Sequence, residues 1–221
     1  MIVWIDFESY SDKPITHGTY AYCAAAEVMV TAWAIDDEDA QCVDHTAGEE
    51  LPDRLVAALA DPAVVICAHN SMFDRTLARL ASNTPAPLRA AGEQVERWRD
   101  TMVWALAHSL PGALDTLGAV MGLPPDQRKH ADGKALVNLF CKPRPITAKV
   151  RRATRETHPD EWQRFLEYAA ADVVAMRAIA QRLPRWNYGF TDAGKRELAL
   201  WHIDQRINDR GFAVDVELAT A

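Results

Sequence analysis

The chain has 221 residues, of which 49% are hydrophobic and 25% are charged, and its formal net charge is −7. This composition is typical of a globular domain with a hydrophobic core, and it argues against a disordered chain. The longest apolar stretches fall well short of the ~20 residues that a membrane-spanning helix needs, and the negative net charge argues against a protein that coats nucleic acid by charge alone.

The N-terminus and the cysteines bear on the cellular location. Residues 1–7 lack the basic region and the cleavage site of a signal peptide. The four cysteines are widely spaced and include no CxxC pair, which favours reduced packing residues over a zinc site or a disulfide framework. We therefore expect a cytoplasmic protein, in a bacterium or in a phage-infected host cell.

Apolar, β-rich stretches alternate with stretches of helical periodicity along the chain. Strands are predicted at residues 2–9, 28–35, 41–45 and 63–68. Helices are predicted at residues 49–60, 71–81, 100–110 (with Asp100 as the N-cap), 113–121, 132–140, 160–183 and 195–210. Residues 83–88 and 142–145 each contain two prolines and are predicted to be loops. This alternation predicts an α/β fold, with a sheet sandwiched between helices.

The first predicted strand carries two acids, Asp6 and Glu8. Their spacing puts both side chains on one face of a sheet, with Ile5 and Phe7 on the other. Burying such a pair without a counter-charge is costly, and a divalent cation would offset the cost. Mg²⁺ prefers carboxylate oxygens, water and substrate phosphate as ligands. The structural alternative is a strand end at which both acids are solvated.

Asn70 and Asp74 follow the strand predicted at residues 63–68. Asn70 comes at the carboxyl end of that strand, the edge at which ligands bind in open α/β sheets. Asp74 falls in the first turn of the next predicted helix. The structural alternative for Asp74 is helix capping, because the dipole of a helix favours an acid in the first turn whatever the function.

The longest predicted helix carries Tyr168 and Asp172, which are four residues apart and therefore neighbours on one face. Phe165, Ala169 and Val173 are spaced to cover an adjacent apolar face toward the sheet. A tyrosine on such a helix usually serves packing. Asp172 lies in an otherwise apolar turn, where its charge requires a partner.

Residues 128–155 carry nine cations and a single acid, Asp132. The structural interpretation is a solvated loop and helix face. The functional interpretation is a strip that follows nucleic-acid phosphates beside an acidic site. The nine cations are Arg128, Lys129, Lys134, Lys142, Arg144, Lys149, Arg151, Arg152 and Arg155.

Taken together, Asp6-x-Glu8, Asn70-x-x-Phe73-Asp74 and Tyr168-x-x-x-Asp172 resemble, in order and spacing, the three exonuclease motifs of the DEDD nuclease superfamily in its tyrosine branch. Residues 4–9, 18–22 and 140–143 resemble phage-type family A DNA polymerases, which carry such a domain at the N-terminus. Residues 197–221 resemble the region where their polymerase part begins. The resemblance therefore covers nearly the whole chain.

This resemblance implies a ribonuclease H-like (DnaQ-like) α/β fold, with a central mixed β-sheet flanked by helices. It implies a 3′-to-5′ exonuclease domain at residues 1–195 and the start of a polymerase-type region at residues 196–221. No polymerase catalytic motif follows before Ala221, so we expect a fragment or a truncated gene product whose native role is proofreading.

The resemblance also implies a mechanism, in which two Mg²⁺ or Mn²⁺ ions promote hydrolysis at the 3′ end of single-stranded DNA and nucleoside 5′-monophosphates are released. Tyr168 would orient the attacking water or help to take its proton. Phe7 and Glu8 would meet the terminal sugar, whereas Asn70 and Phe73 would shape the path of the strand. The metal ligands would be four carboxylates: Asp6, Glu8, Asp74 and Asp172.

Three other functions stay open at this point. The motifs do not select the sugar, so an exoribonuclease of the tyrosine branch that resembles ribonuclease D is the nearest alternative. A non-catalytic module that grips single strands or braces a polymerase is the second. A Ser/His/Asp hydrolase built on His69, Ser71 and Asp74 is the third, although no nucleophile-elbow motif accompanies these residues.

Overall fold

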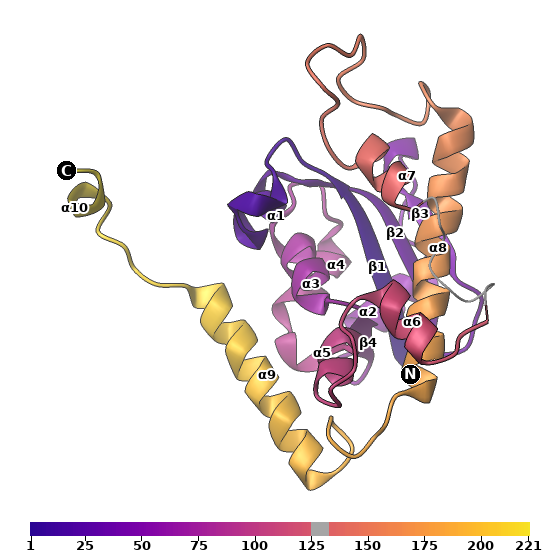
Figure 1. Ribbon diagram of the computed structural model, residues 1–221, viewed down its shortest axis with the longest axis vertical. Helices are drawn as coiled ribbons and strands as arrows, with labels where there is room; N and C mark the ends of the chain where they lie inside the picture. The colour runs from indigo at the N-terminus through magenta and orange to yellow at the C-terminus, as the bar shows by residue number, and fades with distance from the viewer. Residues whose placement is uncertain (125–132) are drawn as a thin grey trace. The chain divides into compact units, whose positions relative to one another are not determined.

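The computed structural model describes residues 1–124 and 133–221. The chain divides into two compact units, Met1–Leu183 and Pro184–Ala221. The first unit holds the whole β-sheet and every candidate site residue (Figure 1). The boundary expected after residue 195, between an exonuclease domain and a polymerase-type region, concerns function and stays a prediction. None of the helices in the described part of the chain is long and apolar enough to cross a membrane.

A five-stranded mixed sheet forms the centre of the first unit, with the strand order β3-β2-β1-β4-β5. The pairs β1/β2 and β2/β3 are antiparallel, whereas β1/β4 and β4/β5 are parallel. Almost every side chain of the two longest strands is buried, as expected for strands that are covered on both faces. The strands are β1 (Ile2–Tyr10), β2 (Glu27–Ile35), β3 (Gln41–Asp44), β4 (Val65–Ala68) and β5 (Trp98–Asp100).

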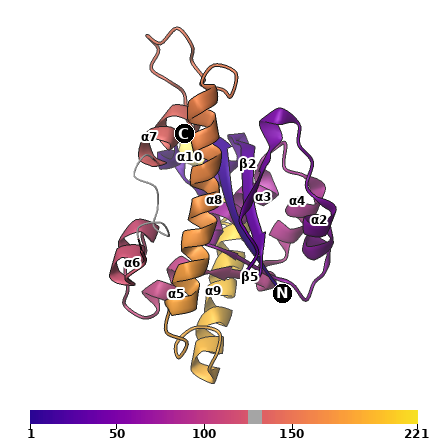
Figure 2. The ribbon, with the colours of Figure 1, turned by 90° about the vertical axis from the view of Figure 1, so that its right-hand side faces the viewer.

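Two helical layers cover the sheet, which confirms the predicted α/β class. One layer is built on the long helix α8 with α6 and α7, and the other contains α2, α3 and α4 (Figure 2). The α-helices of this unit are α1 (Thr19–Ala25), α2 (Asp53–Ala60), α3 (Ser71–Leu80), α4 (Ala86–Glu93), α5 (Thr101–Leu106), α6 (Leu114–Val120), α7 (Gly133–Phe140) and α8 (Pro159–Arg182). Short 3-10 helices lie at Ile15–His17, His45–Ala47 and Val95–Arg97.

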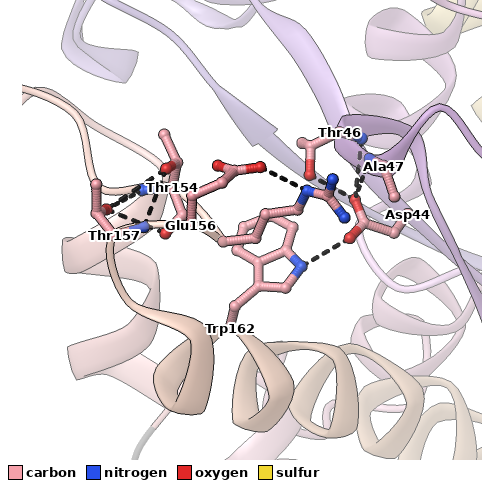
Figure 3. Close-up of polar contacts among 8 residues, drawn as sticks. Asp44, Thr46, Ala47, Thr154, Glu156, Thr157 and Trp162 are labelled. Atoms are coloured by element: carbon pink, nitrogen blue, oxygen red, sulfur yellow. Dashed lines mark hydrogen bonds and ion pairs between the residues drawn. The ribbon is translucent and has the colours of Figure 1, made fainter.

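Helix α8 is fixed over the sheet by a polar contact near its N-terminus. Trp162 is buried, and its indole N–H donates to Asp44 Oδ2 at 2.8 Å across 118 residues of sequence (Figure 3). The other oxygen of Asp44 accepts the backbone N–H groups of Thr46 and Ala47. The ring of Phe140 packs edge-on against Trp162, with centroids 5.0 Å apart. The hydrogen bond of Trp162 joins the first turns of α8 to Asp44, the last residue of β3.

The four predicted strands are present with boundaries within two residues of the prediction, but several predicted helix boundaries are wrong. The helix predicted at residues 49–60 begins only at Asp53, because Pro52 takes the extended N-cap conformation. The helix predicted at 100–110 ends at Leu106, and the backbone of Ser109 is left-handed, with φ 59°. The helix predicted from residue 132 is described from Gly133 onward, and Asp132 lies outside the described residues.

Besides the short 3-10 helices, three elements of the first unit escaped the sequence prediction, α1, β5 and α4, and so did α10 (Val216–Thr220) of the second unit. The loop predicted at residues 83–88 contains the start of α4. Its two prolines suit a helix start, since Pro85 is the N-cap and Pro87 lies in the first turn, where a missing N–H leaves no intrahelical bond unmade. The strand β5 has only three residues, too few for a period-2 pattern to be visible.

The second unit consists of α9 (Asp192–Arg210) and α10 (Val216–Thr220). Helix α9 begins three residues before the predicted Lys195, because the Thr191 hydroxyl caps it by accepting the Gly194 N–H at 3.1 Å. It ends at Gly211, as predicted, with φ 62°.

Candidate active site

Asp6 and Glu8 lie in the middle of the sheet on β1. They pair with Ala32 and Val30 of β2, and the register shifts directly after Glu8. The two side chains point to the same face of the strand, as their spacing predicts. Asp6 is half-buried and Glu8 is buried. The Glu8 carboxylate accepts a hydrogen bond from the Cys141 thiol at 3.5 Å, across 133 residues of sequence.

The segment after β4 brings Asp74 beside these two acids. The strand ends at Ala68, and Asn70 turns the chain into α3 through a left-handed conformation, with φ 64°. Asp74 lies in the first turn of α3, as predicted, and is only 3% exposed. Its Oδ1 accepts the backbone N–H of Phe7 at 3.3 Å. Asp74 is therefore joined to β1 at the residue between Asp6 and Glu8.

Helix α8 supplies Tyr168 and Asp172 to the same region. Both side chains are buried, with exposed fractions of 3% and 5%. Burial raises the pKa of Tyr168 well above its usual value. The negative charges of Asp172, Glu8 and Asp6 raise it further. Tyr168 therefore lies near Asp172 and near the acids of β1. The structure thus brings together five side chains from three separate segments of the chain.

A cavity of about 370 Å³ opens at this point. It is lined by Asp6 and Asp172, by His69 and Asn70 after β4, and by residues 112–115 at the start of α6. Glu8 and Asp74 are not among the residues that line it, and both are more deeply buried than Asp6. Within residues 1–124 and 133–221, no group of three or more His, Cys, Asp or Glu side chains is clustered tightly enough to hold a metal ion.

Negative charge dominates the surroundings of the site. Burial raises the pKa of Asp74, and the charge of Asp6 raises it further. Burial likewise raises the pKa of Cys42 to about 12, with added contributions from the charges of Asp6 and Glu8. The pKa of Cys141 is raised by burial and by Glu8. Three neighbouring groups on different elements thus experience the same concentration of carboxylates.

The sequence-predicted substrate contacts lie at different depths. Asn70 is exposed at the rim of the cavity. Phe73 is half-buried, with its ring centroid 5.7 Å from that of Tyr22, and it lines a second cavity of about 540 Å³. The side chain of Phe7 is buried, and its backbone N–H is held by Asp74.

The geometry does not join His69 and Ser71 as a hydrolase triad would require. Ser71 is fully buried, and its hydroxyl donates to Asp100 at 3.1 Å. The ring of His69 instead lies between the Thr101 hydroxyl, 2.8 Å from Nδ1, and the Gly112 carbonyl, 2.7 Å from Nε2. His69 thereby connects the end of β4 to the loop that forms one wall of the first cavity.

Asp100 positions the site in a way that the sequence did not reveal. As predicted, it caps α5, because Oδ1 accepts the backbone N–H groups of Met102 and Val103. It also accepts the backbone N–H groups of Asn70 at 3.0 Å and of Ser71 at 2.8 Å. The same carboxylate therefore holds the starts of both α3 and α5.

Gly133 is a second residue that sequence reasoning missed. It is buried at the start of α7, where a β-carbon would lie 2.4 Å from Cε2 of Tyr168. A side chain at this position would displace the tyrosine ring, so only glycine permits this close approach. No pattern in one sequence pairs two residues so far apart.

The predicted basic strip is only partly described. Arg128 and Lys129 lie outside the described residues. Arg152 forms an ion pair with Glu27 and lies over the ring of Tyr10, with its guanidinium carbon 3.9 Å from the ring centroid. Most of the remaining cations lie between α7 and α8.

Comparison with known proteins yields one relative by sequence. The chain is 34% identical over 220 residues to a DNA polymerase of Bacillus phage SP02, and the match covers 97% of this chain. The chain spans 32% of the length of that relative. The two are homologous over this region. No protein-family model matches the chain.

Comparison with solved structures supports the fold. NrnC of Brucella melitensis is 18% identical and has a TM-score of 0.51, with 97% of this chain and 88% of that chain covered. A structure of the same protein with bound Mg²⁺ has a TM-score of 0.46, with 95% and 86% covered. The ribonuclease H-like fold expected from the sequence, a mixed sheet flanked by helices, is thereby confirmed.

Proposed function

We propose that this chain is a metal-dependent 3′-to-5′ exonuclease domain of the tyrosine branch of the DEDD superfamily. It removes nucleotides from the 3′ end of single-stranded DNA and releases nucleoside 5′-monophosphates. The observation that carries this proposal is that Asp172 of α8 and Asp6 of β1 line the same cavity, with the buried Tyr168 close to both acids and to Glu8.

The donor set fits hard divalent cations. The four acids Asp6, Glu8, Asp74 and Asp172 offer carboxylate oxygens, the ligand type that Mg²⁺ and Mn²⁺ prefer. Three of them are buried, and the charge of Asp6 raises the pKa of Asp74, so cations would relieve a repulsion that the fold imposes. Since the described residues hold no preformed cluster of three ligands, water and substrate phosphate would complete the coordination, as is common for Mg²⁺.

When bound, two such ions would stabilise the attacking and leaving oxygens of an in-line displacement. The protein supplies the positioning. The carboxylates are held by the rigid centre of the sheet and by the first turn of α3, whose start is fixed by Asp100. The first cavity admits solvent and a phosphodiester to Asp6 and Asp172, the two acids that line it.

Tyr168 is the proposed group for water orientation. A tyrosine hydroxyl with its ordinary pKa of about 10 is already protonated at neutral pH, and burial raises the pKa of Tyr168 further, so the group acts as a hydrogen-bond donor and acceptor, not as a phenolate. Tyr168→Phe should lower kcat about a hundredfold, the lower range for a single acid–base group, while divalent-metal affinity stays unchanged. An equal loss of metal affinity would make Tyr168 a structural residue instead.

The surrounding side chains suit a single strand. Asn70 lies at the rim of the first cavity, and Phe73 lines the second, where an aromatic ring can stack on a base. Glu8 would meet the terminal sugar from within the sheet. Phe7 would contribute through its backbone, because its side chain is buried.

The homology to a phage DNA polymerase favours DNA over RNA as the substrate and proofreading as the role. The chain corresponds to a minor part of that relative, so a polymerase region in the same polypeptide is part of the proposal. Degradation of matched DNA and RNA oligonucleotides distinguishes a DNA exonuclease from an exoribonuclease that resembles ribonuclease D.

The test is degradation of a 5′-labelled single-stranded oligonucleotide with Mg²⁺ or Mn²⁺. The wild type should shorten it one nucleotide at a time, whereas Asp6→Ala and Asp172→Ala should leave it intact. Retained shortening in either variant overturns the assignment. Binding by the wild type without any metal-dependent product would instead indicate a non-catalytic single-strand-binding module.

A further inference from the structure

A basic loop stands out between α7 and α8. Residues 142–151 carry Lys142, Arg144, Lys149 and Arg151 and no acid, in a chain whose net charge is −7. In both ribbon views this stretch extends away from the two helical layers (Figures 1 and 2). We call residues 142–151 the basic arm.

Internal hydrogen bonds give the basic arm a defined form. The backbone N–H of Arg144 donates to the carbonyl of Arg151 at 2.8 Å, which brings the two ends of the arm together. A turn at the tip is closed by the Ala148 N–H, which donates to the Pro145 carbonyl at 2.8 Å. The tip also presents Ile146, which is 84% exposed. The arm is therefore a closed loop that displays cations.

Both ends of the basic arm are anchored in the first unit. On one side, the carbonyl of the buried Cys141 accepts the N–H of Ser11 at 3.3 Å. On the other side, Arg152 forms its ion pair with Glu27 and stacks on Tyr10. Arg152 is thus already engaged within the protein, whereas Lys149 and Arg151 are exposed. The neighbouring cations have separate roles, one as an anchor and two as a displayed surface.

The basic arm begins where the acidic site ends. Cys141, the residue before the arm, contacts Glu8 through its thiol. The first two residues of the arm, Lys142 and Pro143, line the second cavity together with Phe73. A strand that leaves the acids past Phe73 therefore meets the arm next.

We propose that the basic arm binds backbone phosphates of the single strand on the 5′ side of the scissile bond, with Arg152 as its anchor. This inference rests on the proposed function. Nucleic acid is the occupant because four cations without an acid complement a phosphate backbone. Each side of the loop has five residues and reaches at most ~17 Å at ~3.4 Å per residue. Successive phosphates of a stacked strand are ~3.4 Å apart, so the arm can contact phosphates up to ~5 nucleotides from the site.

The experiment compares two double variants of the full chain that each remove two exposed cations. Lys149→Gln with Arg151→Gln alters the arm, and Arg164→Gln with Arg182→Gln alters exposed positions of α8. Affinity for a fluorescent oligothymidylate is measured over a range of salt, with EDTA to prevent cleavage. The arm variant should reduce the slope of log K against log salt by ~1.4, at ~0.7 for each single-strand phosphate contact. The α8 variant should keep the wild-type slope.

A second readout is kcat/KM with Mn²⁺ on oligonucleotides of two lengths. The arm variant should lose activity on a strand well beyond ~5 nucleotides and match the wild type on one of ~3, which is too short to reach the arm. An unchanged salt slope, or an equal loss at both lengths, overturns the proposal. If the arm variant alone changes the slope but no protein cleaves with metal, the arm stands and the exonuclease proposal fails.

Discussion

Two sets of buried carboxylates in the first unit differ in what surrounds them. Asp44 and Asp100 are buried among neutral donors: Asp44 accepts bonds from Trp162 and two backbone N–H groups, and Asp100 accepts bonds from four. Asp74 is buried near Asp6, and the buried Asp172 lines the same cavity as Asp6. Burial alone therefore does not identify a functional acid.

The difference gives an expectation for mutations. A buried acid that is satisfied by neutral donors contributes to stability, because its loss leaves those donors without a partner. A buried acid that faces other acids is kept at a cost in stability, and its substitution should remove activity while leaving the fold intact or more stable. Substitution of Asp44 or Asp100 should therefore lower stability, whereas substitution of Asp74 or Asp172 should lower activity without lowering stability.

The largest expected effect is on activity at Asp74. Asp74→Asn keeps an oxygen to accept the Phe7 N–H and removes a charge that burial and Asp6 disfavour. We expect kcat to fall on the order of 10³-fold, about 4 kcal/mol of transition-state stabilisation. In the absence of metal, Tm should equal or exceed that of the wild type. A lower Tm together with full activity would show that Asp74 has a structural role, like Asp44 and Asp100.

The next effect is on stability at Asp100. Asp100→Ala removes the acceptor for backbone N–H groups at the starts of two helices, α3 and α5. We expect the free energy of unfolding in urea to fall by about 3 kcal/mol or more, since each buried unsatisfied donor costs ~1–3 kcal/mol. A matched control is Asp115→Ala, an exposed first-turn acid of α6, which should lose less than about 1 kcal/mol. Equal losses in the two variants would contradict the distinction.

The sequence indicated the acids of the candidate site and Tyr168, but it did not indicate the residues that hold these side chains in place. Asp6 and Glu8 share a face because strand periodicity is two, and Tyr168 and Asp172 share one because a helix repeats every 3.6 residues. Those rules are local. The second role of Asp100 depends on where β4 and β5 pair, and the contact of Cys141 with Glu8 depends on tertiary packing.

The fold shows the same division between local and tertiary information. The long strands β1 and β2 and the helix α8 have enough residues for their periodicity to be recognised. The three-residue strand β5 exists because it pairs with β4, which no local pattern encodes. The start of α4 was predicted to be a loop because prolines both break helices and begin them, and the outcome depends on which residues come before the helix.

A smaller effect is expected at the structural contact of α8. Trp162→Phe retains the aromatic packing against Phe140 and loses the hydrogen bond to Asp44. The unfolding free energy should fall by about 1–3 kcal/mol, because a buried carboxylate oxygen loses its donor. The kcat on a short oligonucleotide should not change. A loss of kcat without a loss of stability would show that this contact controls the active site directly.

The smallest effect is a dependence of stability on pH at His45, next to Asp44. Burial lowers the pKa of His45 below its usual 6.5, and its Nε2 lies 2.8 Å from the Thr31 hydroxyl. The unfolded chain therefore takes up the proton first, so the stability present above pH 6.5 is lost as the pH falls below it. Tm should decrease more between pH 7.5 and 5.5 in the wild type than in His45→Gln. Parallel decreases would exclude His45 as the cause.

The proposal that β1, α3 and α8 contribute to one cation site is tested most directly by the rise in Tm that it predicts on addition of Mn²⁺. A ligand at 100 times its Kd stabilises the folded state by about 2.7 kcal/mol, so the rise is measurable by calorimetry without any substrate. The wild type and Asp53→Asn, which alters an exposed first-turn acid of α2 outside the cavity, should show the rise, whereas Asp6→Asn and Asp172→Asn should both lose it. A wild-type rise in both of these variants would contradict a shared site.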